Sequence, residues 1–287
     1  MARRNVLFRQ HLNRSLAGNI AVFLCLLLFG VFFAFPVVFA INTAFKPLNE
    51  ILVFPPRFFA VNPTRENFIQ LSKMVAEFWV PLSRYIFNSV FISAVVTLGH
   101  LLLSSMAAYP MAHHNFPGSK ALNTVIVLSL LFTSTVTYIP QYVILANLRM
   151  INTYWAIILP AMQSSLGLYL MRSFMMGIPK EMLEAARIDG ANEKRTYFSI
   201  VMPNVKPAAL TLIIFSFQSI WNYVGGSAVY AEQLKGLPAL LQSIAAAGVA
   251  RSGVTAAATV LLMIPPVLIF ILSQNHVIET MSTSGLK

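Results

Sequence analysis

The sequence predicts an all-α, polytopic integral membrane protein with six transmembrane helices. Of its 287 residues, 57% are hydrophobic and 10% are charged, whereas soluble chains carry about 25% charged residues. The mean hydropathy is +0.71. Charged residues divide the chain into six uncharged stretches, and each is long enough for the roughly 20 residues that a helix needs to cross a bilayer. The net charge of +11 does not indicate nucleic-acid binding, because the basic residues flank the apolar stretches.

The six expected spans are separated by polar segments of unequal length. The first span, residues 16–44, follows a basic tail, residues 1–15, and we interpret it as an uncleaved helix because its apolar run is too long for a signal peptide. A proline-rich loop, residues 45–84, comes next. The core domain, residues 85–278, then holds five spans, and a short tail, residues 279–287, ends the chain. The first of these five is expected at about residues 85–111, and the other four lie between residues 120 and 149, 149 and 172, 206 and 232, and 251 and 279.

The distribution of basic residues predicts the orientation in the membrane. Twelve of the 20 Lys and Arg residues fall on the side of the N-terminus: four in the tail, six from Arg172 to Lys206, and Lys120 and Lys287. Five of the other eight are spread over the loop 45–84. Because cytoplasmic loops carry an excess of Lys and Arg, we expect both termini in the cytoplasm and the loop 45–84 outside it.

The longest strongly polar run between apolar spans is residues 178–207, on the side expected to be cytoplasmic. It predicts a helix, a turn and a second helix. Pro179 suits the first helical position, and Gly190 ends the first helix because it tolerates a left-handed conformation. Glu184 precedes Arg187 by three residues, a spacing at which the two side chains can pair.

Asn192 is the expected N-cap of the second helix, and Pro203 and Pro207 are expected to end or kink it. This loop resembles the EAA loop of binding-protein-dependent ABC transporter permeases: Glu-Ala-Ala, three residues, Gly, nine residues, then Ile-x-Leu-Pro. Every spacing is met, and the one departure is Met202 for Leu, which conserves volume. In that family the loop docks on the nucleotide-binding subunit. The resemblance therefore implies these ATPase-coupling residues: Glu184, Ala185, Ala186, Asp189, Gly190, Ile200 and Pro203.

Other segments are similar to the carbohydrate-uptake, maltose-type branch of the same family. They are FKPLNEILVFPP at 45–56, NPTRENF at 62–68 and AHHNFPGSK at 112–120. The resemblance implies a type I ABC importer permease fold in a prokaryotic inner membrane. It also implies a second homologous permease, two nucleotide-binding ATPase subunits, an extracytoplasmic solute-binding protein, and a sugar or oligosaccharide substrate. A plain amphipathic connector or a membrane-anchored assembly factor is the alternative, but neither accounts for the loop spacings.

The sequence offers little covalent chemistry. It contains no G-x-x-x-x-G-K-[ST] motif, so we expect no bound cofactor in this chain, and the resemblance assigns ATP and Mg to the partner subunit. We expect no catalytic residues and no metal site, since His113-His114 lack the spacing of a helical metal pair and Cys25 is the only cysteine. The chain is accordingly expected not to be an enzyme.

The expected spans contain no Lys, Arg, Asp or Glu. Ion-coupled carriers often place such charges along their path, so a secondary carrier or channel without an ATPase partner is the disfavoured alternative. Neutral polar side chains can pair with sugar hydroxyls in an otherwise dry pocket. They can equally form hydrogen bonds between helices, and this alternative stays open for each residue. The residues hypothesised to line a substrate path are Gln163, Gln218, Trp221 and Asn222.

Overall fold

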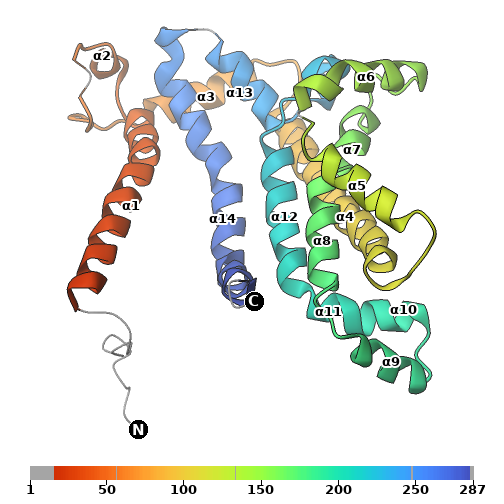
Figure 1. Ribbon diagram of the computed structural model, residues 1–287. Helices are drawn as coiled ribbons and strands as arrows, with labels where there is room; N and C mark the ends of the chain where they lie inside the picture. The colour runs from red at the N-terminus through yellow and green to blue at the C-terminus, as the bar shows by residue number, and fades with distance from the viewer. Residues whose placement is uncertain (1–15, 56, 133, 247, 285–287) are drawn as a thin grey trace.

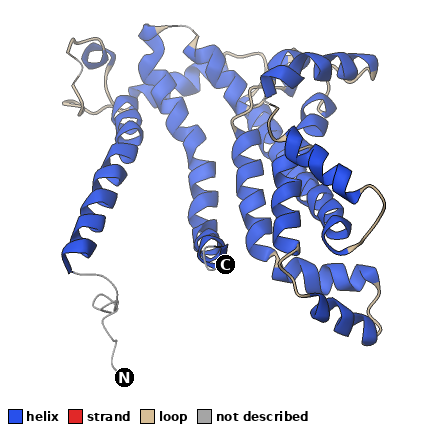
Figure 2. Ribbon diagram, viewed as in Figure 1, coloured by secondary structure: helices blue, strands red, loops and turns tan. Residues whose placement is uncertain are grey.

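The computed structural model describes residues 16–55, 57–132, 134–246 and 248–284. Within these ranges the regular secondary structure is entirely helical, which confirms the expected all-α fold (Figure 2). The predicted N-terminal tail, residues 1–15, and the last three residues of the predicted C-terminal tail lie outside the described residues.

Three of the described helices are long and apolar enough to cross a membrane by themselves, and a fourth span results if one bent helix pair is counted. That pair consists of residues Glu193–Asn204 and α12 (Lys206–Trp221), which are bent by 77°. The last of the three long helices continues to Ser284, past residue 278, where the sixth span was expected to end. The three are α1 (Leu16–Ala44), α4 (Leu82–His113) and α14 (Ser252–Ser284).

The third and fourth expected spans differ from the single helices predicted, because each is broken into two shorter helices. The third contains α5 (Ser119–Ser129) and α6 (Ser134–Asn147), and the fourth contains α7 (Trp155–Met162) and α8 (Ser165–Met175). Figure 1 shows α6 lying across the direction of α12 and α8. In a bilayer, broken helices expose backbone groups that lipid cannot satisfy, so they are tolerated where they are buried in protein or line a cavity.

The remaining helical segments are short and lie at the two ends of the long helices (Figure 1). At one end are α2 (Leu48–Ile51), α3 (Glu66–Ala76), η3 (Gly226–Ala228), η4 (Glu232–Leu234), α13 (Leu237–Ala245) and η5 (Val249–Arg251). At the other end are α9 (Lys180–Ile188), α10 (Glu193–Thr196), the π-helical turn η2 (Tyr197–Val201) and α11 (Met202–Asn204).

Helix α4 is the centre of the packing, since α7, α8, α12 and α13 all contact it. Toward its C-terminal end, Ala108 and Tyr109 join a buried cluster with Met171 and Met175 of α8 and Leu212 of α12. This cluster continues into the loop 178–207, so the loop is packed against the helical core.

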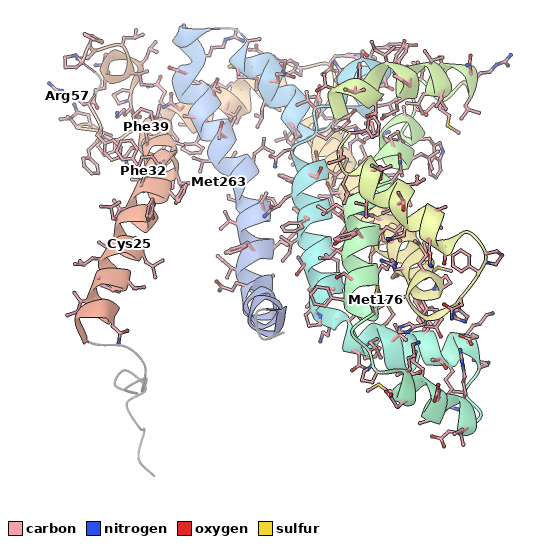
Figure 3. All side chains as sticks on the ribbon, in the orientation of Figure 1. Cys25, Phe32, Phe39, Arg57, Met176 and Met263 are labelled. Atoms are coloured by element: carbon pink, nitrogen blue, oxygen red, sulfur yellow. The ribbon has the colours of Figure 1, made fainter. Side chains whose placement is uncertain are left out.

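Helix α1 contacts α14 and diverges from it toward Leu16 (Figure 1). Its large apolar side chains are exposed along most of its length; Phe32, for example, is 69% exposed. Figure 3 shows Cys25 in the half of α1 that stands away from α14. An apolar surface of this length is the one expected of a helix in contact with lipid or with another membrane subunit.

The loop between α1 and α4 is ordered by Glu50 and Asn67. Glu50 accepts hydrogen bonds from the backbone N–H groups of Val61 (2.9 Å) and Asn62 (2.8 Å). The hydrogen bond from Val61 in particular holds the pKa of Glu50 below its usual range. Asn67 is buried and donates to the carbonyl oxygens of Ala44 (2.9 Å) and Lys46 (2.7 Å), which fixes the loop to the end of α1.

Gly167 lies where α8 packs against side chains of α4 and α12. A Cβ at this position would overlap the imidazole ring of His100 and would lie 2.7 Å from Cδ1 of Leu212. We expect Gly167→Ala to lower the free energy of unfolding by about 1–3 kcal/mol, because a well-packed interior must shift to admit a methyl group. A thermal melt of the detergent-solubilised protein measures this change. Gly30→Ala is the control, since a Cβ on Gly30 would meet nothing within 4 Å; equal losses in both variants would contradict the prediction.

Candidate functional site

The first helix of the loop 178–207 ends as its sequence predicts. Gly190 has φ +80°, in the left-handed region. Its N–H donates to the carbonyl of Arg187 (3.0 Å), and the N–H of Ala191 donates to the carbonyl of Ala186 (2.9 Å). This pair of bonds is a Schellman motif, in which the left-handed residue follows the cap. The motif explains the glycine, because position 190 is the one that must take a left-handed backbone.

The helix begins one residue later than predicted, because Pro179 has ψ 136° and is the N-cap instead of the first helical residue. The second helix begins as predicted: Asn192 accepts a hydrogen bond from the N–H of Arg195 (2.8 Å). The predicted kink is also present, at Val205 (φ −99°, ψ 14°), between Pro203 and Pro207. The loop therefore turns sharply into α12.

Helix α9 has one buried face and one exposed face. Leu183 and Ala186 are buried, and Leu183 joins the cluster shared with α4 and α8. Glu184 and Ala185 are exposed, and Ile188 is 86% exposed, an unusual environment for a large apolar side chain. Of the other predicted coupling residues, Asp189, Gly190 and Pro203 are exposed and Ile200 is half-buried against the same cluster.

Glu193 ties the loop to the end of α4. Its carboxylate accepts hydrogen bonds from the hydroxyl of Tyr109 (2.7 Å) and from Nη2 of Arg187 (3.1 Å), and it lies 3.7 Å from Nε2 of His114. The bond from Tyr109 holds the pKa of Glu193 below its usual range, so this carboxylate is charged at neutral pH. Arg187 thus pairs with Glu193, and the predicted contact between Arg187 and Glu184 is not formed.

A second hydrogen bond reinforces the junction between loop and helix. The hydroxyl groups of Ser105 in α4 and Tyr197 in the π-helical turn lie 2.6 Å apart, and both residues are buried. No pattern in the sequence predicted this junction. Tyr109 and Glu193 are 84 residues apart, and no local pattern marks either as a partner of the other.

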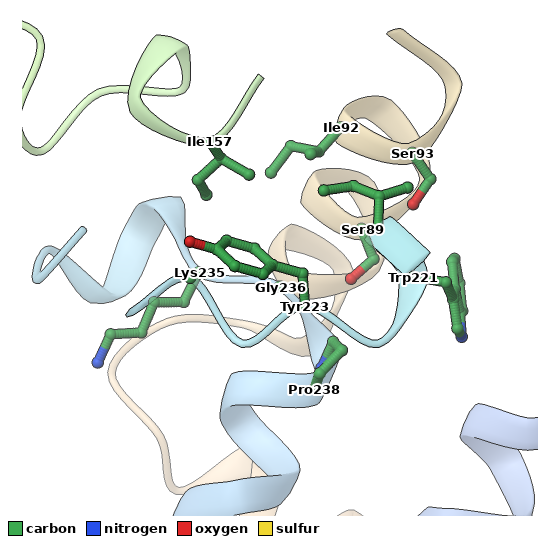
Figure 4. A pocket seen from close by; sticks show the side chains of 11 residues that line it. Ser89, Ile92, Ser93, Ile157, Trp221, Tyr223, Lys235, Gly236 and Pro238 are labelled. Carbon is green, nitrogen blue, oxygen red and sulfur yellow. The ribbon is translucent and has the colours of Figure 1, made fainter. Parts of the chain in front are cut away.

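Trp221, predicted to line the substrate path, is 4% exposed at the end of α12. Its indole N–H donates to the carbonyl of Leu262 in α14 (3.0 Å), and its ring stacks on Phe217. The side chain also lies at the edge of a narrow cavity of about 20 Å³ that Ser89 and Lys235 line (Figure 4). This hydrogen bond joins α12 to α14. Trp221 therefore forms a bond between helices, which was the alternative to a place in the substrate path.

Gln163 lies in the break between α7 and α8 and lines two neighbouring cavities of about 770 and 450 Å³. Neither cavity is lined by Gln218, Trp221 or Asn222. Asn222 instead donates to the carbonyl of Gln218 within the same helix end (2.9 Å). The structure therefore places Gln163 apart from the three residues of α12 with which it was grouped.

The described residues include no group of three or more His, Cys, Asp and Glu side chains placed to hold a metal ion. His114 faces Glu193, and Cys25 is exposed on α1. The prediction that the chain binds no metal or cofactor stays a prediction.

Residues 22–283 match the family described as binding-protein-dependent transport system inner membrane component. The chain belongs to this family. It is 28% identical over 261 residues to the arabinooligosaccharides transport system permease protein AraQ of Halalkalibacterium halodurans, an alignment that covers 88% of this chain and 91% of that protein. It is 31% identical over 201 residues to the sn-glycerol-3-phosphate transport system permease protein UgpE of Yersinia enterocolitica, covering 68% of this chain and 71% of that protein.

Among solved structures, the fold is similar to that of a bacterial ABC transporter involved in the import of the acidic polysaccharide alginate. The TM-score is 0.77 at 18% sequence identity, and the alignment covers 91% of this chain and 98% of the other. The family member described here therefore has the expected ABC importer permease fold. As an inner membrane transport component with several apolar helices, it is a multi-pass membrane protein.

Proposed function

We propose that this permease imports a sugar or oligosaccharide and that ATP hydrolysis on a separate nucleotide-binding subunit drives the import. The observation that carries the proposal is the loop 178–207, which extends from one end of the bundle and exposes Ile188 (Figure 1). Its predicted coupling residues form a capped helix followed by a sharp turn into α12. A rigid helix with an exposed apolar residue is suited to insertion into a groove on a partner.

The complete transporter would contain a second homologous permease, two ATPase subunits that bind ATP and Mg, and an extracytoplasmic solute-binding protein. The beginning of α1, the end of α14 and the loop 178–207 lie toward the same end of the bundle (Figure 1). Together with the basic residues of the tail and the loop, this arrangement supports a cytoplasmic location for both termini in a prokaryotic inner membrane.

In the proposed mechanism, closure of the ATPase dimer displaces α9. The displacement reaches α4 through Glu193 and Tyr197, which are hydrogen-bonded to that helix. It reaches α12 through the bend at Val205. The two permease cores then switch between inward-facing and outward-facing states, and the solute-binding protein delivers the ligand at the opposite end. The chain transmits work and forms part of the path; it performs no covalent step.

Purification of the chain together with the products of its neighbouring genes tests the proposal. In nanodiscs, we expect ATP hydrolysis to be stimulated several-fold when a solute-binding protein and its ligand are added. A stable, folded chain that recruits no ATPase subunit would contradict the proposal and favour a carrier or channel that works alone.

Ile188→Asp is expected to weaken retention of the ATPase subunit by about tenfold or more. Burying an isoleucine at an interface contributes about 1.5–3 kcal/mol, and a carboxylate at the same place must be desolvated.

Glu184→Lys, one turn earlier on the same exposed face, should weaken retention through charge reversal. Co-purification from detergent measures both effects. Ile69→Asp, at an exposed position of α3, is the matched control; equal loss in this variant would contradict a specific docking face.

A further inference from the structure

The two broken spans meet each other. Helix α5 ends at Ser129, and the hydroxyl of Ser129 donates to the hydroxyl of Ser165, the first residue of α8, at 2.6 Å. Between α7 and α8, Gln163 and Ser164 have extended backbones, with ψ 104° and 117°. Segments that lie 36 residues apart in the chain are thus joined where both leave helical conformation. In many transporters, interrupted membrane helices mark the place where substrate binds.

The cavities of about 770 and 450 Å³ open on this junction from two sides. They share five lining residues: Ser129, Leu159, Gln163, Ser164 and Ser165. We call the two together the junction cavity. Each volume lies in the range of about 300–1,000 Å³ typical of ligand sites.

The side chains that line the junction cavity are all uncharged. The polar ones are seryl and threonyl hydroxyls and glutamine amides, which both donate and accept hydrogen bonds, as sugar hydroxyls do. The polar lining residues are Ser104, Ser129, Thr137, Gln141, Gln163, Ser164 and Ser165. The others, such as Leu130 and Phe132, are apolar and match the apolar patches of a sugar ring.

A cavity that binds an anionic ligand must supply a different kind of lining. Moving a phosphate or a carboxylate out of water is costly unless a cationic side chain pairs with it. Arginine and lysine are the side chains that normally supply this pairing. The lining of the junction cavity consists instead of neutral groups matched to hydroxyls.

We propose that the junction cavity is the place where this chain contacts its transported ligand, and that the ligand is a neutral, hydroxyl-rich sugar. The proposal rests on the proposed importer function and specifies its substrate class. It assigns Gln163 and Gln141 as ligand contacts from two different walls of the cavity. Phosphorylated sugars and uronic acid oligomers are the excluded classes.

The first test compares ligand classes in the complete transporter, reconstituted in liposomes with its solute-binding protein. The probes are malto- and arabino-oligosaccharides, oligogalacturonate and glycerol phosphate. Neutral oligosaccharides should stimulate ATP hydrolysis and enter the vesicles. Stimulation by oligogalacturonate or glycerol phosphate alone would overturn the inference and leave the importer function intact. A chain that assembles with no ATPase would overturn the importer function itself.

The second test assigns the contact to the cavity. Gln163→Ala should lower uptake of the neutral ligand about fivefold, for the loss of one hydrogen-bonding side chain. The ATPase subunit should co-purify with the variant at the wild-type level, because the loop 178–207 is untouched. Gln70→Ala, in the exposed part of α3, is the matched control and should leave uptake unchanged. If Gln163→Ala fails to assemble, Gln141→Ala in α6 takes its place. Wild-type uptake in the assembled variant would overturn the assignment.

Discussion

Glu193→Ala should lower ligand uptake by about tenfold while the ATPase subunit stays bound and continues to hydrolyse ATP. Glu193 accepts one hydrogen bond from α4, through Tyr109, and one from α9, through Arg187. Hydrogen bonds to charged groups contribute about 1.5–3 kcal/mol, and about 1.4 kcal/mol corresponds to a factor of ten. Without this carboxylate, movement of the loop would be transmitted to α4 less completely. The ratio of ligand molecules imported to ATP hydrolysed measures the effect.

A second variant separates transmission from simple destabilisation. If Tyr109 and Glu193 act as one link, the double variant Tyr109→Phe with Glu193→Ala should be no worse than Glu193→Ala alone. Glu66→Ala, at an exposed carboxylate of α3, should import normally. Additive losses in the double variant, or loss of the ATPase subunit from the complex, would show that the two residues do not form a transmission link.

The parts of the loop 178–207 that the sequence predicted correctly are those governed by local rules. A helix end needs a left-handed residue and a capped start needs a side-chain acceptor within three residues, so Gly190 and Asn192 identify both ends. The length and apolar character of α1, α4 and α14 were equally evident, since hydropathy along a window reports transfer into lipid.

Contacts between distant segments could not be predicted in the same way. The hydrogen bond between Tyr109 and Glu193 depends on how α4 packs against the loop, which no local pattern specifies. The breaks before Ser134 and Ser165 were also missed, because hydropathy measures how apolar a stretch is and not whether its helix is continuous. For the same reason Gln163 was grouped with Trp221, although only tertiary packing decides which cavity each side chain lines.

Gly190→Val should reduce ligand uptake by at least tenfold at wild-type levels in the membrane. Left-handed conformation costs a non-glycine residue about 1–3 kcal/mol, and most for a β-branched one. The strain would break the bonds from Gly190 to Arg187 and from Ala191 to Ala186, which fix the direction in which the chain leaves α9. The exposed face of α9 would then be oriented differently, and its contact with the ATPase subunit would be weaker.

The substitutions at Gly190 should rank by backbone preference and not by size. A Cβ at this position would meet nothing within 4 Å, so space does not limit what can replace the glycine. Gly190→Asn should therefore import better than Gly190→Ala, although asparagine is larger, because asparagine tolerates the left-handed region. Gly190→Val should import least. Uptake assays on the three variants at matched expression measure this order. A ranking by side-chain volume would contradict the backbone argument and indicate that a partner packs against Gly190.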